Sequence, residues 1–81
     1  MSLPPESLEV GKCYLADARV YPQVWQVIRI FPDRRLEYKH RPASGERRHH
    51  WTKAVSDIRV FASFVTREVP CDWTSEMGSE E

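Results

Sequence analysis

The chain has 81 residues, of which 41% are hydrophobic and 30% are charged, and its formal net charge is zero. This composition is typical of a globular protein rather than of a disordered one, and the length allows one small domain. A chain of this size buries only about 60–65% of the surface that it exposes when unfolded, so its core must be thin. No stretch approaches the roughly 20 apolar residues of a membrane-spanning helix, and we predict no membrane partner.

The charges are unevenly distributed along the chain. Residues 29–53 contain eight lysine and arginine residues but three acidic ones, whereas residues 72–81 contain four acidic residues and no basic one. This segregation suggests an anionic partner for the middle of the chain, or an acidic tail that folds back over it. The alternative is a basic outer face of a sheet that is simply solvated.

The N-terminal residues and the cysteines indicate a compartment. The first ten residues have no apolar run and carry Glu6 and Glu9, unlike a secretory signal peptide, so we predict a cytoplasmic protein. Cys13 and Cys71 are far apart in sequence, and we predict free thiols in a reducing environment. The alternative is a disulfide that ties the C-terminal segment to the first strand.

The first half of the chain predicts two strands. Residues 1–7 include two consecutive prolines, and we expect a flexible lead-in there. Residues 12–16 alternate between two faces and form a short strand, followed by a loop over residues 17–22. Residues 23–31 are rich in β-branched and aromatic side chains and form the strongest strand, with apolar residues on both of its faces.

Two more strands complete a β-meander with residues 23–31. Residues 36–41 alternate cleanly after a turn at residues 32–35, and Ser44-Gly45 marks a second turn that leads into a strand at residues 47–53. If the hairpin is centred on that second turn, His40 and His49 lie nearly opposite one another.

The C-terminal third predicts a helical turn and a closing strand. Apolar residues at helical spacing predict one turn near residues 56–61, and residues 63–69 form the last strand, which Pro70 ends. Residues 70–81 are predicted to be an acidic tail with Trp73 as its one anchor. The predicted core residues are Val27, Ile30, Leu36, Tyr38, Ile58, Phe61 and Phe64.

These elements predict an all-β fold, a small five-stranded barrel or curled antiparallel sheet with one short helical turn, over residues 8–69. The order of strand, long loop, meander, helical turn and final strand resembles the small five-stranded Src-homology-3-like barrels, including Tudor-like domains. The resemblance lies in layout, and the residues that carry it are Val10-Gly11-Lys12-Cys13-Tyr14, Trp25 to Phe31, Trp51, Phe61 and Phe64. It implies a binding module.

Catalytic and metal-binding motifs are absent from the sequence. It contains no Gly-x-Ser-x-Gly, no phosphate-binding glycine-rich loop and no His-Glu-x-x-His, so we predict no enzymatic activity. Facing His40 and His49 could hold Zn²⁺ with Cys13 or an acidic residue as a further ligand, but no Cys-x-x-Cys supports such a site. We therefore predict no catalytic residue, no metal and no cofactor.

Two binding functions remain. The first is a protein–protein interaction, or self-association, through a groove lined by aromatic residues. The alternative is single-stranded nucleic acid bound by the basic meander, where cations contact phosphates and bases stack on rings. Besides Tyr14, a further groove candidate, the predicted ligand-binding residues are Tyr21, Trp25, Trp51, Lys39, Arg41, Arg47, Arg48 and Lys53.

Overall fold

The structure of the protein, a computed structural model, describes residues 3–17 and 22–74. Five strands lie in these residues: β1 (Cys13–Asp17), β2 (Pro22–Ile30), β3 (Arg35–Pro42), β4 (Thr52–Asp57) and β5 (Val65–Val69). One α-helix, α1 (Ile58–Phe64), and two short 3-10 helices, η1 (Pro5–Ser7) and η2 (Glu46–His49), accompany them. The predicted all-β class with one short helix is confirmed.

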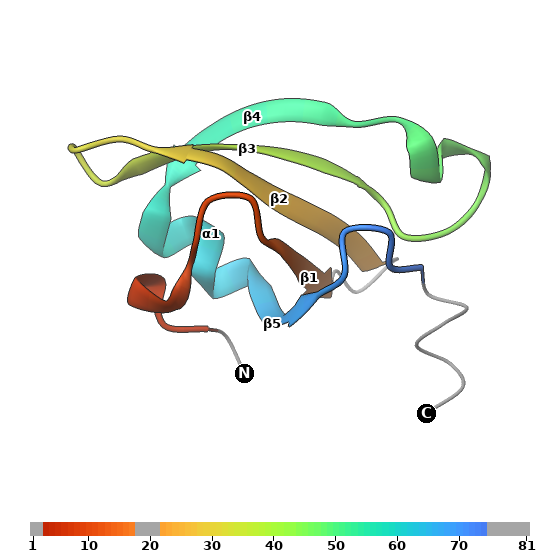
Figure 1. Ribbon diagram of the computed structural model, residues 1–81, viewed down its shortest axis with the longest axis horizontal. Coiled ribbons are helices and arrows are strands. Elements are labelled where there is room, and N and C mark those ends of the chain that lie inside the picture. The colour runs from red at the N-terminus through yellow and green to blue at the C-terminus, as the bar shows by residue number, and fades with distance from the viewer. Residues whose placement is uncertain (1–2, 18–21, 75–81) are drawn as a thin grey trace.

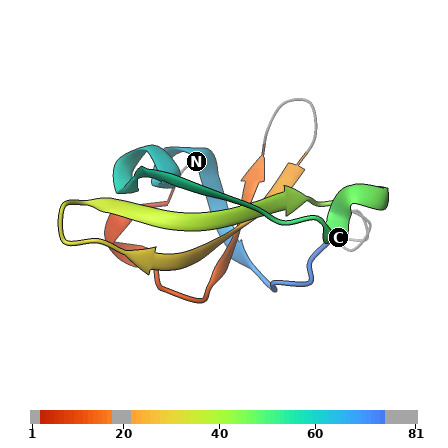
Figure 2. The same cartoon turned by 90° about the horizontal axis from the view of Figure 1, so that it is seen from above.

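The strands form one antiparallel sheet in the order β4-β3-β2-β1-β5. The long strands β2, β3 and β4 are consecutive neighbours, and α1 carries the chain from the edge strand β4 to the opposite edge strand β5 (Figure 1). Figure 2 shows β2 and β3 curving together from the 31–35 turn. The described part of the sheet is open between β4 and β5, so it is not a closed barrel.

Local chemistry explains where two of the elements begin and end. The turn between β2 and β3 closes through a 2.8 Å hydrogen bond from the Phe31 N–H to the Arg35 carbonyl, and Asp33 accepts a 2.8 Å bond from the Arg35 side chain. Asp57 caps the N-terminus of helix α1, and its carboxylate accepts a 2.8 Å hydrogen bond from the backbone N–H of Arg59. Such a cap satisfies a donor that the first helical turn leaves free.

The sheet buries apolar side chains on both of its faces. We call one the helix face, because α1 packs there against residues such as Tyr14, Val27 and Leu36. The other carries Cys13 and Val24, and residues 70–74, which we call the strap, pack against it through Trp73. Successive strand residues point to opposite faces, which explains why β1 and β2 contribute to both clusters.

Two shifts in strand register change which side chains point to each face of the sheet. In β2 the register shifts between Val27 and Arg29, and in β5 one extra residue separates the partners of Leu15 and Ala16. The second shift places Val65 opposite Ala16 on the helix face and Val69 opposite Cys13 on the strap face. A bulge of this kind bends a strand and redirects its side chains.

The predicted core is correct in part. Val27, Leu36 and Phe61 are fully buried, and the partly buried Tyr38 and Ile58 pack against the same cluster. The prediction of Ile30 and Phe64 as core residues is wrong, because their exposed fractions are 39% and 57%. Ile30 ends β2 beyond the bulge, and Phe64 is the last residue of α1, so neither has a neighbouring layer to cover it.

The predicted strand at residues 47–53 is wrong over residues 47–51, and only residues 52 and 53 belong to a strand. Residues 46–49 form η2, and β4 begins only at Thr52. The longer connection changes the pairing, so that His40 lies opposite Thr52 rather than opposite His49. The proposed histidine pair across the hairpin therefore does not form.

The chain ends beyond residues 8–69 take part in the packing. Leu3 packs against the core of the helix face, and its N–H donates a 3.2 Å hydrogen bond to the Val65 carbonyl. On the strap face, Cys13 and Cys71 form a disulfide with a Cα–Cα distance of 5.1 Å. The predicted free thiols are therefore wrong, because folding brings β1 and the strap together across a separation of 58 residues. No helix among the described residues combines the length and the apolar character needed to cross a membrane.

Candidate functional site

A group of aromatic side chains lies partly open on the helix face. The rings of Trp25 and Tyr38 stack with centroids 4.9 Å apart, and Phe64 lies 5.8 Å from Trp25. The His40 ring extends the group, with its centroid 6.3 Å from that of Trp25. We call these four residues the aromatic platform, and the buried Phe61 supports it from below, 5.1 Å from Tyr38.

Three elements position the aromatic platform. Trp25 comes from β2, Tyr38 and His40 come from β3, and Phe64 comes from the end of α1. The Trp25 Nε1–H donates a 2.8 Å hydrogen bond to Gln23, which fixes the indole plane. Trp25, Tyr38 and His40 are half-buried and Phe64 is 57% exposed, so the platform presents ring surface that the described residues leave uncovered.

A polar cavity adjoins the His40 end of the aromatic platform. Its volume is about 290 Å³. Its lining residues are Gln23, His40, Pro42, Arg47, His50 and Thr52. Amide, hydroxyl and imidazole groups beside an apolar ring surface can orient a ligand that the rings bind.

Burial lowers the pKa of His40 from its ordinary value of 6.5. The unfolded protein therefore takes up this proton at a higher pH than the folded protein does. The contribution to stability is present above about pH 6.5 and is lost as the pH falls through the lower folded-state pKa.

We therefore expect the midpoint of urea unfolding to fall between pH 7 and pH 5 in the wild type and to fall less in His40→Gln. His49→Gln, which removes an exposed imidazole from η2, is the matched control. An identical pH dependence in the wild type and in His40→Gln would contradict the assignment.

A second aromatic residue, Trp51, lies on the strap face among cations. The Lys39 ammonium is 4.6 Å from the centroid of the indole, and the Arg41 guanidinium is 5.2 Å from it. Both distances are within the range of a cation–π interaction. A cavity of about 240 Å³ beside Trp51 is lined by Arg41, Arg48, His49, Trp51, Cys71, Asp72 and Thr74.

Arg41 is buried, with 4% of its surface exposed, and main-chain carbonyls are its hydrogen-bond acceptors. Its guanidinium donates to the carbonyls of Cys71 at 2.9 Å and Trp73 at 2.7 Å, both in the strap. Burial lowers the pKa of Arg41, and the attraction of the nearby Asp72 opposes that shift. The side chain therefore holds the strap and is not an open contact for a ligand.

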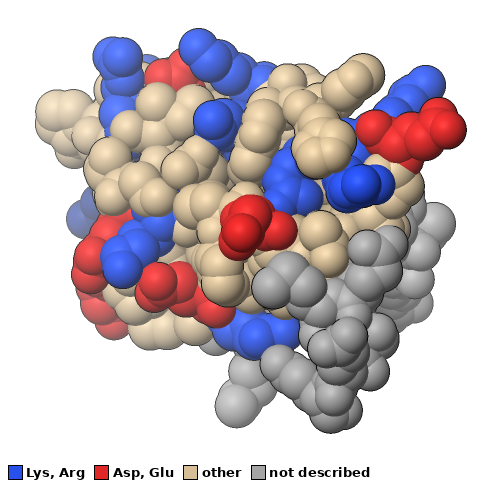
Figure 3. Space-filling view, turned by 45° about the vertical axis from the view of Figure 1, so that its right-hand side comes forward, with Lys and Arg blue, Asp and Glu red and all other residues tan. Residues whose placement is uncertain are grey.

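The predicted basic residues are spread over β3, β4 and η2. Lys39 and Lys53 are direct partners on β3 and β4, Arg47 and Arg48 belong to η2, and Arg41 lies beneath the strap. Figure 3 shows Lys and Arg side chains at several separate places, with Asp and Glu side chains between them. The structure thus brings Trp51, Lys39 and Arg41 together but places Trp25 on the opposite face, whereas Tyr21 lies outside the described residues.

Three platform residues are missing from the predicted ligand-binding set. The sequence patterns assign Tyr38 and Phe64 to the core, and they indicate His40 only as a metal ligand. The alternation of residues 36–41 does place Tyr38 and His40 on one face, so sequence could have found that pair. Tyr14, the other aromatic candidate, is buried in the core of the helix face.

Comparison with known proteins gives no relative for this chain. No protein-family model matches it, and neither the curated proteins nor the solved structures contain a match.

Proposed function

We propose that the protein is a non-catalytic binding module whose aromatic platform binds an extended segment of a partner protein. The observation that carries this proposal is the stacked Trp25–Tyr38 pair, 4.9 Å between centroids, beside the 57% exposed Phe64. Large aromatic side chains with few rotatable bonds lose little entropy on binding and are the usual anchors of protein interfaces.

The surroundings of the aromatic platform support a peptide rather than a compact apolar ligand. The rings contact one another, so they offer a surface and not an enclosed pocket. The cavity at the His40 end supplies Gln23, Thr52 and His50, which can accept or donate hydrogen bonds to a peptide main chain. An apolar centre with a polar rim is the usual arrangement of such interfaces.

The order of elements is the second support. One strand, a connection, a three-strand meander, a short helix and a last strand follow each other as in the Src-homology-3-like layout. We propose that the fold has this Src-homology-3-like layout and that its binding surface is on the helix face. A partner protein, or a second copy of this chain, would then supply the bound segment.

Phe64→Ser tests the proposal. Peptides selected from a display library against the wild type should bind Phe64→Ser at least tenfold more weakly, because a serine cannot replace the exposed ring. Phe64 is solvent-exposed, so the unfolding midpoint should change little. The control is Val55→Ser, which removes a side chain of similar exposure, 55%, from β4 on the opposite face. Equal loss of binding in both variants, or peptides that bind both like the wild type, would refute the platform as the site.

Nucleic-acid binding is the weaker candidate for the protein as described. Trp51 has Lys39 and Arg41 beside it and Arg48 in the adjoining cavity, but the strap engages Arg41, and Arg47 lines a different cavity. A cytoplasmic location stays a prediction. Cytoplasmic thiol systems reduce most disulfides, so the Cys13–Cys71 bond would be open to reduction in that compartment.

A further inference from the structure

We propose that the strap is a cover released by reduction of the Cys13–Cys71 disulfide, and that the reduced protein binds single-stranded nucleic acid around Arg41 and Trp51. This surface lies on the strap face, so the inference is independent of the aromatic platform. It rests on how the strap is held, on which cysteine residue is exposed and on the chemistry that the strap covers.

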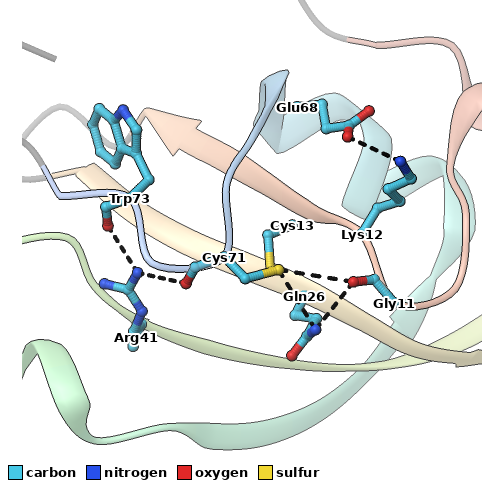
Figure 4. The surroundings of a disulfide bond; sticks show 8 residues. All are labelled: Gly11, Lys12, Cys13, Gln26, Arg41, Glu68, Cys71 and Trp73. Carbon is cyan, nitrogen blue, oxygen red and sulfur yellow. Dashed lines mark hydrogen bonds and ion pairs between the residues drawn. A yellow bond between two sulfur atoms is a disulfide. The ribbon is translucent and has the colours of Figure 1, made fainter. Parts of the chain in front are cut away.

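The strap is held mainly at three points, and the Gln26 amide adds a 3.6 Å contact with the Cys71 sulfur (Figure 4). The disulfide joins it to β1, and the Arg41 guanidinium donates to its Cys71 and Trp73 carbonyls. The Trp73 ring is 7% exposed and packs with Val24 and Val69. Among the described residues the strap makes no strand pairing, and the 2.9 Å hydrogen bond from the Trp73 N–H stays within it, to the Pro70 carbonyl. With the disulfide cut, the Trp73 ring, with the Arg67 guanidinium 5.8 Å from its centroid, the Arg41 guanidinium and the Gln26 amide remain to hold the strap.

The two sulfur-bearing residues differ in access. Cys13 is buried, with 1% of its surface exposed, whereas Cys71 is exposed. A dithiol reductant can therefore attack the Cys71 sulfur through its thiolate. The S–S bond breaks, Cys13 leaves as a thiolate and takes up a proton, and a mixed disulfide joins Cys71 to the reductant. The second thiol of the reductant then displaces Cys71 as a thiol, so the protein gains two electrons and two protons while the dithiol becomes a disulfide.

Departure of the strap changes the charge of the surface. Arg41 loses its two carbonyl acceptors from the strap, and Asp72, a carboxylate that lines the cavity beside Trp51, leaves with them. The guanidinium then has free donors in a setting where Lys39 and Arg48 are the neighbouring cations. Phosphate oxygens are the natural replacement, because hydrogen bonds between two charged groups are stronger than those to neutral carbonyls.

The Trp51 ring at the centre of this surface favours single-stranded over double-stranded nucleic acid. Trp51, which lies in the chain between η2 and β4, is half-buried, with Lys39 4.6 Å and Arg41 5.2 Å from its centroid. An unpaired base can stack on an indole while the flanking phosphates contact the cations, and this combination is typical of single-strand binding. The bases of a duplex are already stacked and cannot use the ring.

The test is fluorescence anisotropy of a labelled oligothymidylate at low salt, with the oxidised protein and with protein reduced by excess dithiothreitol. We expect at least tenfold tighter binding after reduction, with an affinity that falls steeply as salt is added. In the reduced protein, Arg48→Gln should weaken binding several-fold. Arg59→Gln, which removes an exposed arginine from α1, should not. Equal affinity in the two redox states, or an equal effect of the two substitutions, would overturn the inference.

Hydrogen exchange separates release of the strap from unfolding of the domain. In the reduced protein the amides of β2 and β3 should stay protected; loss of their protection would show that reduction unfolds the whole domain, so that the reduced protein does not test the cover. In that case the oxidised Trp73→Ala protein decides, because it keeps the disulfide and loses the ring that anchors the strap. Its binding should exceed that of the oxidised wild type several-fold, and unchanged binding would overturn the inference.

Discussion

Phe61→Ala is expected to lower the free energy of unfolding by about 3–5 kcal/mol. Phe61 is fully buried, and its ring lies 6.1 Å from that of Tyr14, 5.3 Å from that of Trp25 and 5.1 Å from that of Tyr38. Truncation leaves a cavity among three rings that the sheet holds apart, so the site cannot collapse cheaply. A domain of this size has a total stability on the order of 4–12 kcal/mol, so the variant loses a large part of it.

Urea unfolding followed by tryptophan fluorescence measures this effect. Val60→Ala is the control, because it shortens the preceding residue of the same helix, where 49% of the surface is exposed. We expect the control to change the free energy of unfolding by less than about 0.5 kcal/mol, as is usual for surface positions. A Phe61→Ala protein as stable as Val60→Ala would place Phe61 outside the core.

Cys71→Ser is expected to lower the free energy of unfolding by about 2–4 kcal/mol. The disulfide closes a loop with a sequence separation of 58 residues, and loss of the cross-link returns that conformational freedom to the unfolded chain. On the chain-entropy model a loop of this length corresponds to about 4 kcal/mol, an upper value if the unfolded chain keeps residual structure.

The reductant provides the matched control. Wild-type protein in dithiothreitol should unfold at the same urea concentration as Cys71→Ser, and dithiothreitol should not change the midpoint of the variant. If the oxidised wild type and Cys71→Ser unfold at one midpoint, the disulfide does not contribute to stability. A wild type that responds to the reductant less than it responds to the substitution would show that the introduced serine disturbs the strap by itself.

The two faces of the sheet have different structural roles. The helix face carries the larger core, and the residues that the structure describes leave ring surface of Trp25, Tyr38 and Phe64 uncovered there. The strap face carries a smaller cluster that a covalently tied segment completes. An 81-residue chain has little core to spare, so the tie supplements the apolar burial that a small domain lacks.

The strands other than β4, the short helix and the order of these elements were predictable because each depends on local signals. The alternation at residues 36–41 marks β3, the turn residues after Phe31 end β2, and the Asp57 side chain caps α1. Apolar residues on both faces of the strand predicted at residues 23–31 also indicated that it is covered on two faces. In the structure Val27 is buried on the helix face and Val24 on the strap face. These signals act within a few residues of the chain, so they can be recognised in the sequence before the fold is known.

The remaining features were decided only by tertiary structure, because they depend on partners that are distant in sequence. The pairing of His40 with Thr52 follows from η2, which lengthens the connection between β3 and β4. The shift in β5 that separates Val65 from Val69 arises from pairing with β1. The Cys13–Cys71 disulfide forms only because β1 and the strap meet. Arg41 on β3 is buried because its guanidinium donates hydrogen bonds to two strap carbonyls. A residue's neighbours across a sheet are set by register and topology, and local composition does not specify either.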